Sequence, residues 1–296
     1  MTRREILLTA AAAACAKATP PESRMSVEGY IFQQYADSLK KPLADVIGEV
    51  IPMARTAGFQ NIELNPAFLG VATRDRTLSL IRSEGLRMPS VYVGGAMHER
   101  GAADRTIAAA LETGKLCAPF GCKGIVNNPD PKPNNERKTD AELRVETESL
   151  NRMGRALQEQ GFELRVHHHT PQLVEHAREW HYILEHTDPA FVHICVDVDW
   201  AYEGGFEPVA FLREVGSRLR EVHVRSARNK LWLEDVEDSD IDYRRVATYL
   251  RERKLTPLLV VELAYRPQTK ITRSLEEDLR LSRIYTEKVF GVKADV

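Results

Sequence analysis

The chain repeats one pattern along most of its length: a short apolar run of strand character is followed by an amphipathic stretch of helical length. The expected strands span residues 29–35, 61–64, 88–94, 124–128, 163–168, 192–198, 221–225 and 258–263. The expected helices span residues 42–57, 74–84, 103–118, 140–161, 172–186, 208–219, 243–254 and 275–290. Parallel neighbours need a crossover connection, so this alternation predicts a parallel sheet covered by helices.

Eight strand–helix units in roughly 260 residues match the usual size of a TIM barrel. We therefore expect a single (β/α)8 TIM barrel of the α/β class, with residues 24–296 forming one catalytic domain. A doubly wound open sheet is the competing fold, but the first expected strand is not followed by the Gly-rich turn typical of that fold. No low-complexity linker divides residues 29–290.

The first 23 residues have the layout of an export signal and a linker. Arg3 and Arg4 precede a short apolar stretch, residues 14–16 offer a small-x-small cleavage site, and residues 20–23 resemble a linker. The paired arginines favour a twin-arginine signal and a periplasmic or exported protein. The alternative is a cytoplasmic protein whose uncleaved N-terminus forms a frayed helix.

The composition excludes several classes of function. A formal net charge of −2 provides no basic surface for nucleic acid, and we expect no membrane association beyond export. Removal of the export signal with Cys15 leaves Cys117, Cys122 and Cys195, and three cysteines cannot form a complete disulfide framework. Cys117 and Cys122 also lack the spacing of a zinc ribbon. The expected partner is a small-molecule carbohydrate, and assembly into a homo-oligomer is left open.

Acids and histidines gather where the strands are expected to end, which is where a TIM barrel carries its active site. Asp197, His223 and Glu262 each follow an apolar run on three successive strands, so their side chains can converge. Two carboxylates and an imidazole suit one divalent metal ion: Mn²⁺, Mg²⁺, Zn²⁺ or Co²⁺. Strand alternation places His167 and His169 on one face, and either can complete the ligand set or act in catalysis, with Glu262 as a ligand and base.

Three sequence strings carry a resemblance to a known family. They are His-His-His-Thr-Pro at 167–171, Asp-x-Asp-Trp at 197–200 with Gly-Gly at 204–205, and Ser-Asp-Ile-Asp-Tyr at 239–243. The chain resembles the xylose-isomerase-like superfamily of sugar isomerases and epimerases, which includes D-tagatose 3-epimerase and myo-inosose dehydratase relatives. The resemblance implies one divalent ion held by a fifth-strand carboxylate and by residues matching Asp197, His223 and Glu262. This chain has His167 where many relatives have the fifth-strand glutamate.

The resemblance implies an isomerase or epimerase that removes a proton next to the carbonyl of a keto-sugar or related polyol. Because the fifth-strand glutamate is replaced, a hydro-lyase acting on a keto-inositol or 3-keto-glycoside is the alternative, and a sugar-binding barrel without turnover is another. A metal-dependent phosphodiesterase of the apurinic-endonuclease kind is disfavoured by the low net charge. Sugar hydroxyls are bound by amides, charged groups and aromatic walls. The expected substrate contacts are Glu63, His98, Asn127, Lys138, Trp200 and Arg225, with Tyr92 and Tyr265 as further aromatic candidates.

Overall fold

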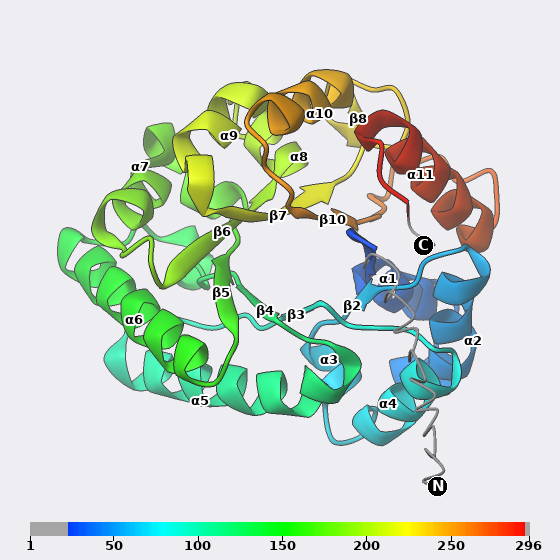
Figure 1. Cartoon of the computed structure of the whole chain (residues 1–296), viewed down its shortest axis with the longest axis horizontal. Helices are drawn as coiled ribbons and strands as arrows, with labels where there is room; N and C mark the ends of the chain where they lie inside the picture. The colour runs from blue at the N-terminus through cyan, green and yellow to red at the C-terminus, as the bar shows by residue number, and fades with distance from the viewer. Residues whose placement is uncertain (1–22, 294–296) are drawn as a thin grey trace, which may run out of the picture.

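The computed structural model describes residues 23–293, so the expected export signal at residues 1–22 lies outside the described residues. Within them, eight parallel strands form one sheet in the order β2-β1-β10-β7-β6-β5-β4-β3. Isolated bridges, such as that between Leu64 and Val91, connect β2 to β3 and close the sheet into a barrel (Figure 1). The barrel strands are β1 (Met25–Glu28), β2 (Ile62–Glu63), β3 (Ser90–Tyr92), β4 (Gly124–Asn127), β5 (Glu163–Val166), β6 (Val192–Asp197), β7 (Leu219–Val224) and β10 (Leu258–Val261).

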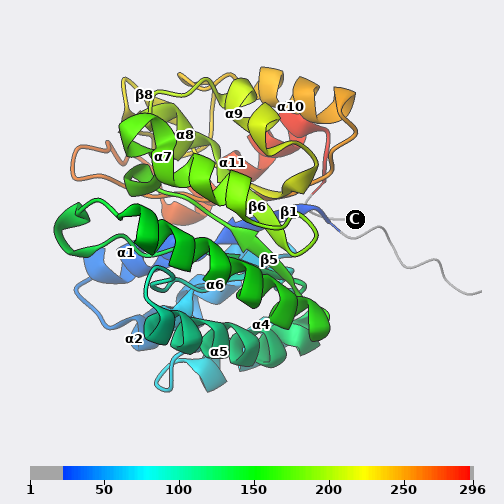
Figure 2. The same ribbon diagram turned by 90° about the vertical axis from the view of Figure 1, so that its left-hand side faces the viewer.

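Helices connect the strands and surround the barrel (Figures 1 and 2). They are α1 (Tyr30–Ser38), α2 (Leu43–Thr56), α3 (Pro66–Leu69), α4 (Arg74–Ser83), α5 (Arg100–Cys117), α6 (Asp140–Glu159), α7 (Thr170–His186), α8 (Val198–Glu203), α9 (Pro208–Val215), α10 (Tyr243–Glu252) and α11 (Leu275–Phe290). A small antiparallel pair, β8 (Ala227–Arg228) and β9 (Leu231–Trp232), lies between β7 and α10. The prediction of a single (β/α)8 TIM barrel is confirmed. In the part of the chain that the structure describes, no helix has the length and apolar character needed to cross a membrane.

The first expected strand, at residues 29–35, is wrong. The strand β1 comes earlier and has only four residues, all buried, whereas the apolar stretch after it forms α1. Ile31, Phe32 and Ala36 are buried because they share one face of that helix. Gly29 makes the turn between strand and helix, and a Cβ there would lie 2.9 Å from the Leu64 side chain.

The two faces of the barrel strands differ in character. Outward-facing residues such as Val27, Ile62, Leu164 and Val222 are fully buried and belong to the main apolar core between the sheet and the helices. The alternate residues point into the barrel, and many of them are charged or polar. The inward-facing residues therefore supply polar and charged groups, whereas the outward-facing residues pack against the helices.

Candidate active site

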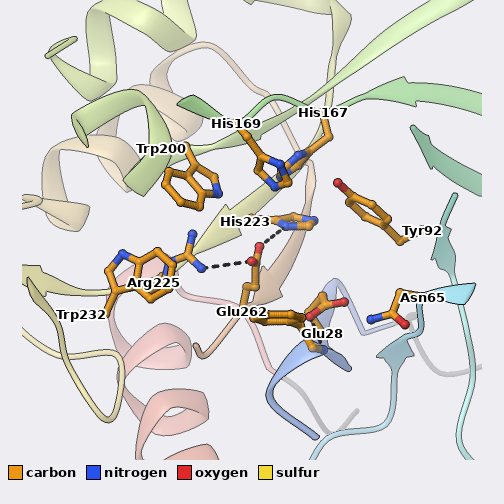
Figure 3. A pocket seen from close by; sticks show the side chains of 11 residues that line it. Glu28, Asn65, Tyr92, His167, His169, Trp200, His223, Arg225, Trp232 and Glu262 are labelled. Atoms are coloured by element: carbon orange, nitrogen blue, oxygen red, sulfur yellow. Dashed lines mark hydrogen bonds and ion pairs between the residues drawn. The ribbon is translucent and has the colours of Figure 1, made fainter. Parts of the chain in front are cut away.

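A cavity of about 380 Å³ opens at the carboxyl ends of the strands (Figure 3). Side chains that follow or end several different strands form its wall, as expected for the active site of a TIM barrel. The lining residues are Glu28, Tyr30, Asn65, Tyr92, His167, His169, Trp200, His223, Arg225, Trp232 and Glu262.

Four buried side chains meet in this region of the barrel: His167, Asp197, His223 and Glu262 offer ligand atoms that all lie within 4.8 Å of one another. His223 Nδ1 lies 2.6 Å from Glu262 Oε2, and His167 Nε2 lies 3.9 Å from Asp197 Oδ2. His167 Nε2 is buried and has no hydrogen-bond partner among the described residues. Two imidazoles and two carboxylates, with one ring nitrogen left free, fit a divalent cation.

Arg225 compensates the negative charge around this cluster. Its guanidinium lies 3.0 Å from Asp197 Oδ2, 3.1 Å from Glu262 Oε1 and 3.3 Å from Asp199 Oδ2. The sixth expected strand, at residues 192–198, extends one residue too far. The strand ends at Asp197, whose Oδ1 accepts a hydrogen bond from the Trp200 amide and caps α8. Asp199 reaches Arg225 from that helix.

Two histidines of the site, His167 and His169, are neutral near neutral pH, whereas the carboxyl groups around His223 raise its pKa. Burial lowers the pKa of His169 to about 4, and burial together with the neighbouring histidines lowers the pKa of His167 well below its ordinary value. A neutral imidazole carries a free lone pair, which is the form that binds a metal or accepts a proton. His168 points away from the site and packs against Trp180, as strand alternation predicted.

Two carboxyl groups on the pocket wall, those of Glu28 and Glu262, have pKa values shifted in opposite directions. Burial opposes ionisation of Glu262, but Arg225 and His223 outweigh it and lower the pKa of Glu262 to about 2. Burial raises the pKa of Glu28 well above its usual value, and the nearby charges of Glu262 and Glu63 raise it further. The pocket therefore presents one ionised and one protonated carboxyl group near neutral pH, the arrangement of a base and an acid.

The predicted substrate contacts divide into two groups. Trp200 and Arg225 line the pocket, as does Tyr92. Glu63 lies behind the wall, with its Oε1 3.2 Å from His223 Nε2. Asn127 is buried and donates its side-chain amide to the Val93 carbonyl.

His98 and Lys138 also lie outside the pocket wall. His98 is mostly buried, 3.9 Å from Glu99. Lys138 forms buried ion pairs with Glu146 and Glu179. The structure therefore gives Lys138 a structural role in place of the expected contact with substrate, and Tyr265 likewise bonds to Asp278 outside the lining.

Sequence reasoning missed Glu28, Tyr30, Asn65 and Trp232 on the pocket wall. Glu28 ends β1, so it was lost with the wrong position of the first strand. Trp232 belongs to the β8–β9 pair, and the guanidinium carbons of Arg225 and Arg266 lie 4.1 Å and 4.2 Å from the centre of its ring. Asn65 directly follows the second expected strand, and this position was the signal that could have identified it.

A family model for the xylose isomerase-like TIM barrel matches residues 51–285. The chain belongs to this family. An inosose dehydratase of Geobacillus kaustophilus is 28% identical over 172 residues, which cover 54% of this chain and 56% of that protein. An inosose dehydratase of Salmonella typhimurium is 28% identical over 148 residues, 44% of this chain and 49% of that one. The chain thus spans about half the length of these relatives.

Solved structures support the same fold over more of the chain. A sugar phosphate isomerase/epimerase from Parabacteroides distasonis superposes with a TM-score of 0.69 at 19% identity, covering 96% of this chain and all of that one (100%). An L-ribulose 3-epimerase superposes with a TM-score of 0.68 at 12% identity, covering 90% of this chain and 94% of that one. At these identities the likeness shows the shared barrel, and the family and its members are consistent with an enzyme.

Proposed function

We propose that this protein is a divalent-metal-dependent enzyme that removes a proton next to the carbonyl of a keto-sugar or related polyol. The observation that carries the proposal is the convergence of His167, Asp197, His223 and Glu262 beside a cavity at the barrel mouth. These four residues would hold the ion, which would supply polarisation of the substrate carbonyl. The identity of the relatives and neighbours as isomerases, epimerases and dehydratases supports the substrate class.

The side chains of the pocket can perform the proton transfers. Glu262 is ionised and can accept the carbon-bound proton, while Glu28 is protonated and can donate one to an oxygen. Arg225 holds the Glu262 carboxylate in place through the 3.1 Å contact (Figure 3). Trp200 and Trp232 meet edge to face, with ring centroids 5.4 Å apart, and provide an apolar corner for the C–H face of a sugar ring.

Loss of water is the second candidate reaction. An elimination needs one base for the carbon-bound proton and one acid for the departing hydroxyl, which is what the contrast between Glu262 and Glu28 offers. A two-base epimerisation, by contrast, needs the carboxyl groups of Glu262 and Glu28 each to be ionised in turn. The inosose dehydratase relatives favour the same alternative. Export to the periplasm remains part of the proposal and rests on the first residues of the sequence alone.

Solvent-exchange NMR tests the proposal and separates its forms. The purified protein, with one of Mn²⁺, Mg²⁺, Zn²⁺ or Co²⁺ added, is incubated in D₂O with a set of keto-sugars and keto-inositols. Incorporation of deuterium at the carbon next to the carbonyl, with no other change in the mass of the substrate, supports isomerisation or epimerisation. An unsaturated or dehydrated product supports the hydro-lyase. Binding without any exchange, in every metal form, refutes the enzyme and leaves a sugar-binding barrel.

A further inference from the structure

The Tyr92 side chain reaches the pocket from the end of β3. Its backbone amide donates to the Leu64 carbonyl, which joins β3 to the end of β2. Its ring packs against His167, with the ring centroids 5.6 Å apart and the ring planes at 72°. A phenylalanine would make both of these contacts, so neither of them explains the hydroxyl group.

The fold does not use the Tyr92 hydroxyl. In the part of the chain that the structure describes, this hydroxyl has no hydrogen-bond partner, although a tyrosine removed from water usually finds one. Figure 3 shows the hydroxyl directed into the pocket, toward the imidazoles of His167 and His223. It is therefore available to a molecule that binds there.

Two other donors of the pocket wall are already engaged. Each of the three guanidinium nitrogens of Arg225 lies within 3.3 Å of a carboxylate oxygen. The indole nitrogen of Trp232 donates to Asp199 Oδ2 at 2.8 Å. Among the described residues whose donors stay free on the wall, Tyr92 is the one whose ring contacts a member of the metal cluster, His167. Its hydroxyl is thus an uncommitted, uncharged donor beside that cluster.

Removal of a proton next to a carbonyl places negative charge on the carbonyl oxygen. In the proposed reaction the carbon-bound proton passes to Glu262, the C–H electron pair forms a carbon–carbon double bond, and the π electrons of the carbonyl move to its oxygen. A donor aimed at this oxygen stabilises the developing charge more than it stabilises the neutral ketone, so it lowers the barrier. A phenol does this without adding a charge to the pocket.

We infer that Tyr92 is a further catalytic residue, whose hydroxyl donates a hydrogen bond to the carbonyl oxygen of the substrate and stabilises the negative charge that this oxygen gains. The inference rests on the proposed function. Glu28 gives up its proton to an oxygen, whereas Tyr92 keeps its own throughout. Because Trp200 and Trp232 lie across the pocket from Tyr92 in Figure 3, the carbonyl end of the substrate faces β3 and the remainder faces the two indole rings.

The first test compares the kinetics of the wild type, Tyr92→Phe and Tyr265→Phe on the keto-sugar that exchanges deuterium fastest in the D₂O screen. We expect Tyr92→Phe to lower kcat by about 10²–10³-fold with little change in KM, as for loss of one donor to a developing oxyanion. Tyr265→Phe is the matched control, since its hydroxyl bonds to Asp278 outside the pocket lining, and it should keep the wild-type kinetics. A kcat of Tyr92→Phe within about threefold of the wild type, or a loss carried by KM alone, overturns the inference.

The second test needs no turnover. The hydroxamate of D-ribonic acid resembles a charged enediolate, whereas ribitol has the same hydroxyl pattern without that group. In calorimetric titrations we expect Tyr92→Phe to bind the hydroxamate about 10- to 100-fold more weakly, as for loss of a hydrogen bond to a charged group, and ribitol almost as the wild type does. Bound metal should stay at the wild-type level. An unchanged affinity for the hydroxamate, an equal loss for both ligands, or loss of metal from the variant overturns the inference.

Failure of this inference differs from failure of the proposed function. If the wild type exchanges deuterium and Tyr92→Phe matches it in both tests, only the role of Tyr92 is refuted. If the wild type shows no exchange in any metal form, the proposed function is refuted, and the hydroxamate titration decides whether the Tyr92 hydroxyl bonds to a ligand oxygen. A wild-type protein that neither exchanges deuterium nor binds the hydroxamate overturns both.

Discussion

Replacing Arg225 with Met should destabilise the protein strongly, because this one guanidinium serves three buried carboxylates. Asp197, Asp199 and Glu262 lie 3.0 to 3.3 Å from it, and Arg225 itself is 2% exposed. Met preserves much of the side-chain volume and removes the charge. Removing one partner of a buried ion pair leaves an uncompensated charge and costs about 3–5 kcal/mol. For a chain of this size that corresponds to a Tm lowered by roughly 6–20 °C.

Arg266→Met provides the matched control for this prediction. Arg266 also lies over the Trp232 ring, but it is partly exposed and pairs with Glu203. A partly exposed pair contributes only about 0–1 kcal/mol, so its loss should lower the Tm by a few degrees at most. Thermal unfolding followed by circular dichroism at neutral pH compares the two variants. If Arg225→Met melts within 2 °C of Arg266→Met, the guanidinium is not compensating those carboxylates and the reasoning is wrong.

The same substitution has a consequence for the pH dependence of stability. The pKa of Glu262 in the folded protein is lowered to about 2, below its ordinary value, so its ionisation stabilises the fold above the unfolded pKa. That contribution is lost as the pH falls from about 4.5 toward 2. Without Arg225, the pKa of Glu262 should rise toward its unfolded value, so this contribution should be smaller and its loss should be complete at a higher pH. Unfolding curves that keep the same acid limb in both proteins would contradict this explanation.

Three further predictions concern single residues. Glu28→Gln should lower kcat by about 10²–10⁴-fold and remove the alkaline limb of the pH–rate profile. Activity that needs protonated Glu28 falls as the pH rises through the raised pKa of this residue, so an unchanged profile excludes Glu28 as the acid. Gly124→Ala should lower the free energy of unfolding by about 1–3 kcal/mol, because the added Cβ would collide with Arg165. Gly101→Ala in α5 is the control and should be neutral or stabilising, because the nearest atom to its Cβ lies 3.9 Å away. Equal urea midpoints for the two variants refute the packing argument. Trp232→Ala should raise KM more than it lowers kcat if the ring binds substrate, and a loss confined to kcat argues against an apolar wall there.

The sequence predicted the residues whose positions depend only on strand periodicity. Asp197, His223 and Glu262 each follow an apolar strand, and a barrel brings all strand ends to one face. It was therefore possible to predict that these three side chains converge without knowing how the side chains pack. The helices with one apolar stripe, such as α6 and α11, were predicted for the same reason.

Residues whose roles depend on register or on a neighbouring element could not be predicted in this way. Periodicity shows that Glu63 points into the barrel, but not how far it lies from the mouth. The strand register decides this: Val260 pairs with His223, so Glu262 lies further toward the mouth, while Glu63 reaches the ring from below. Trp232 reaches the pocket only because β8 and β9 pair with each other, which local pattern does not indicate.

Metal analysis of the purified protein tests the central claim most directly. Zn²⁺ or Mn²⁺ is added, excess ion is removed by gel filtration, and bound metal is measured by mass spectrometry in the wild type, Asp197→Ala, His223→Ala and Glu146→Gln. The convergence of the four side chains at the barrel mouth predicts one ion per chain in the wild type and in Glu146→Gln, and almost none in the other two. Stoichiometric metal in folded Asp197→Ala and His223→Ala, or none in the wild type, would contradict it.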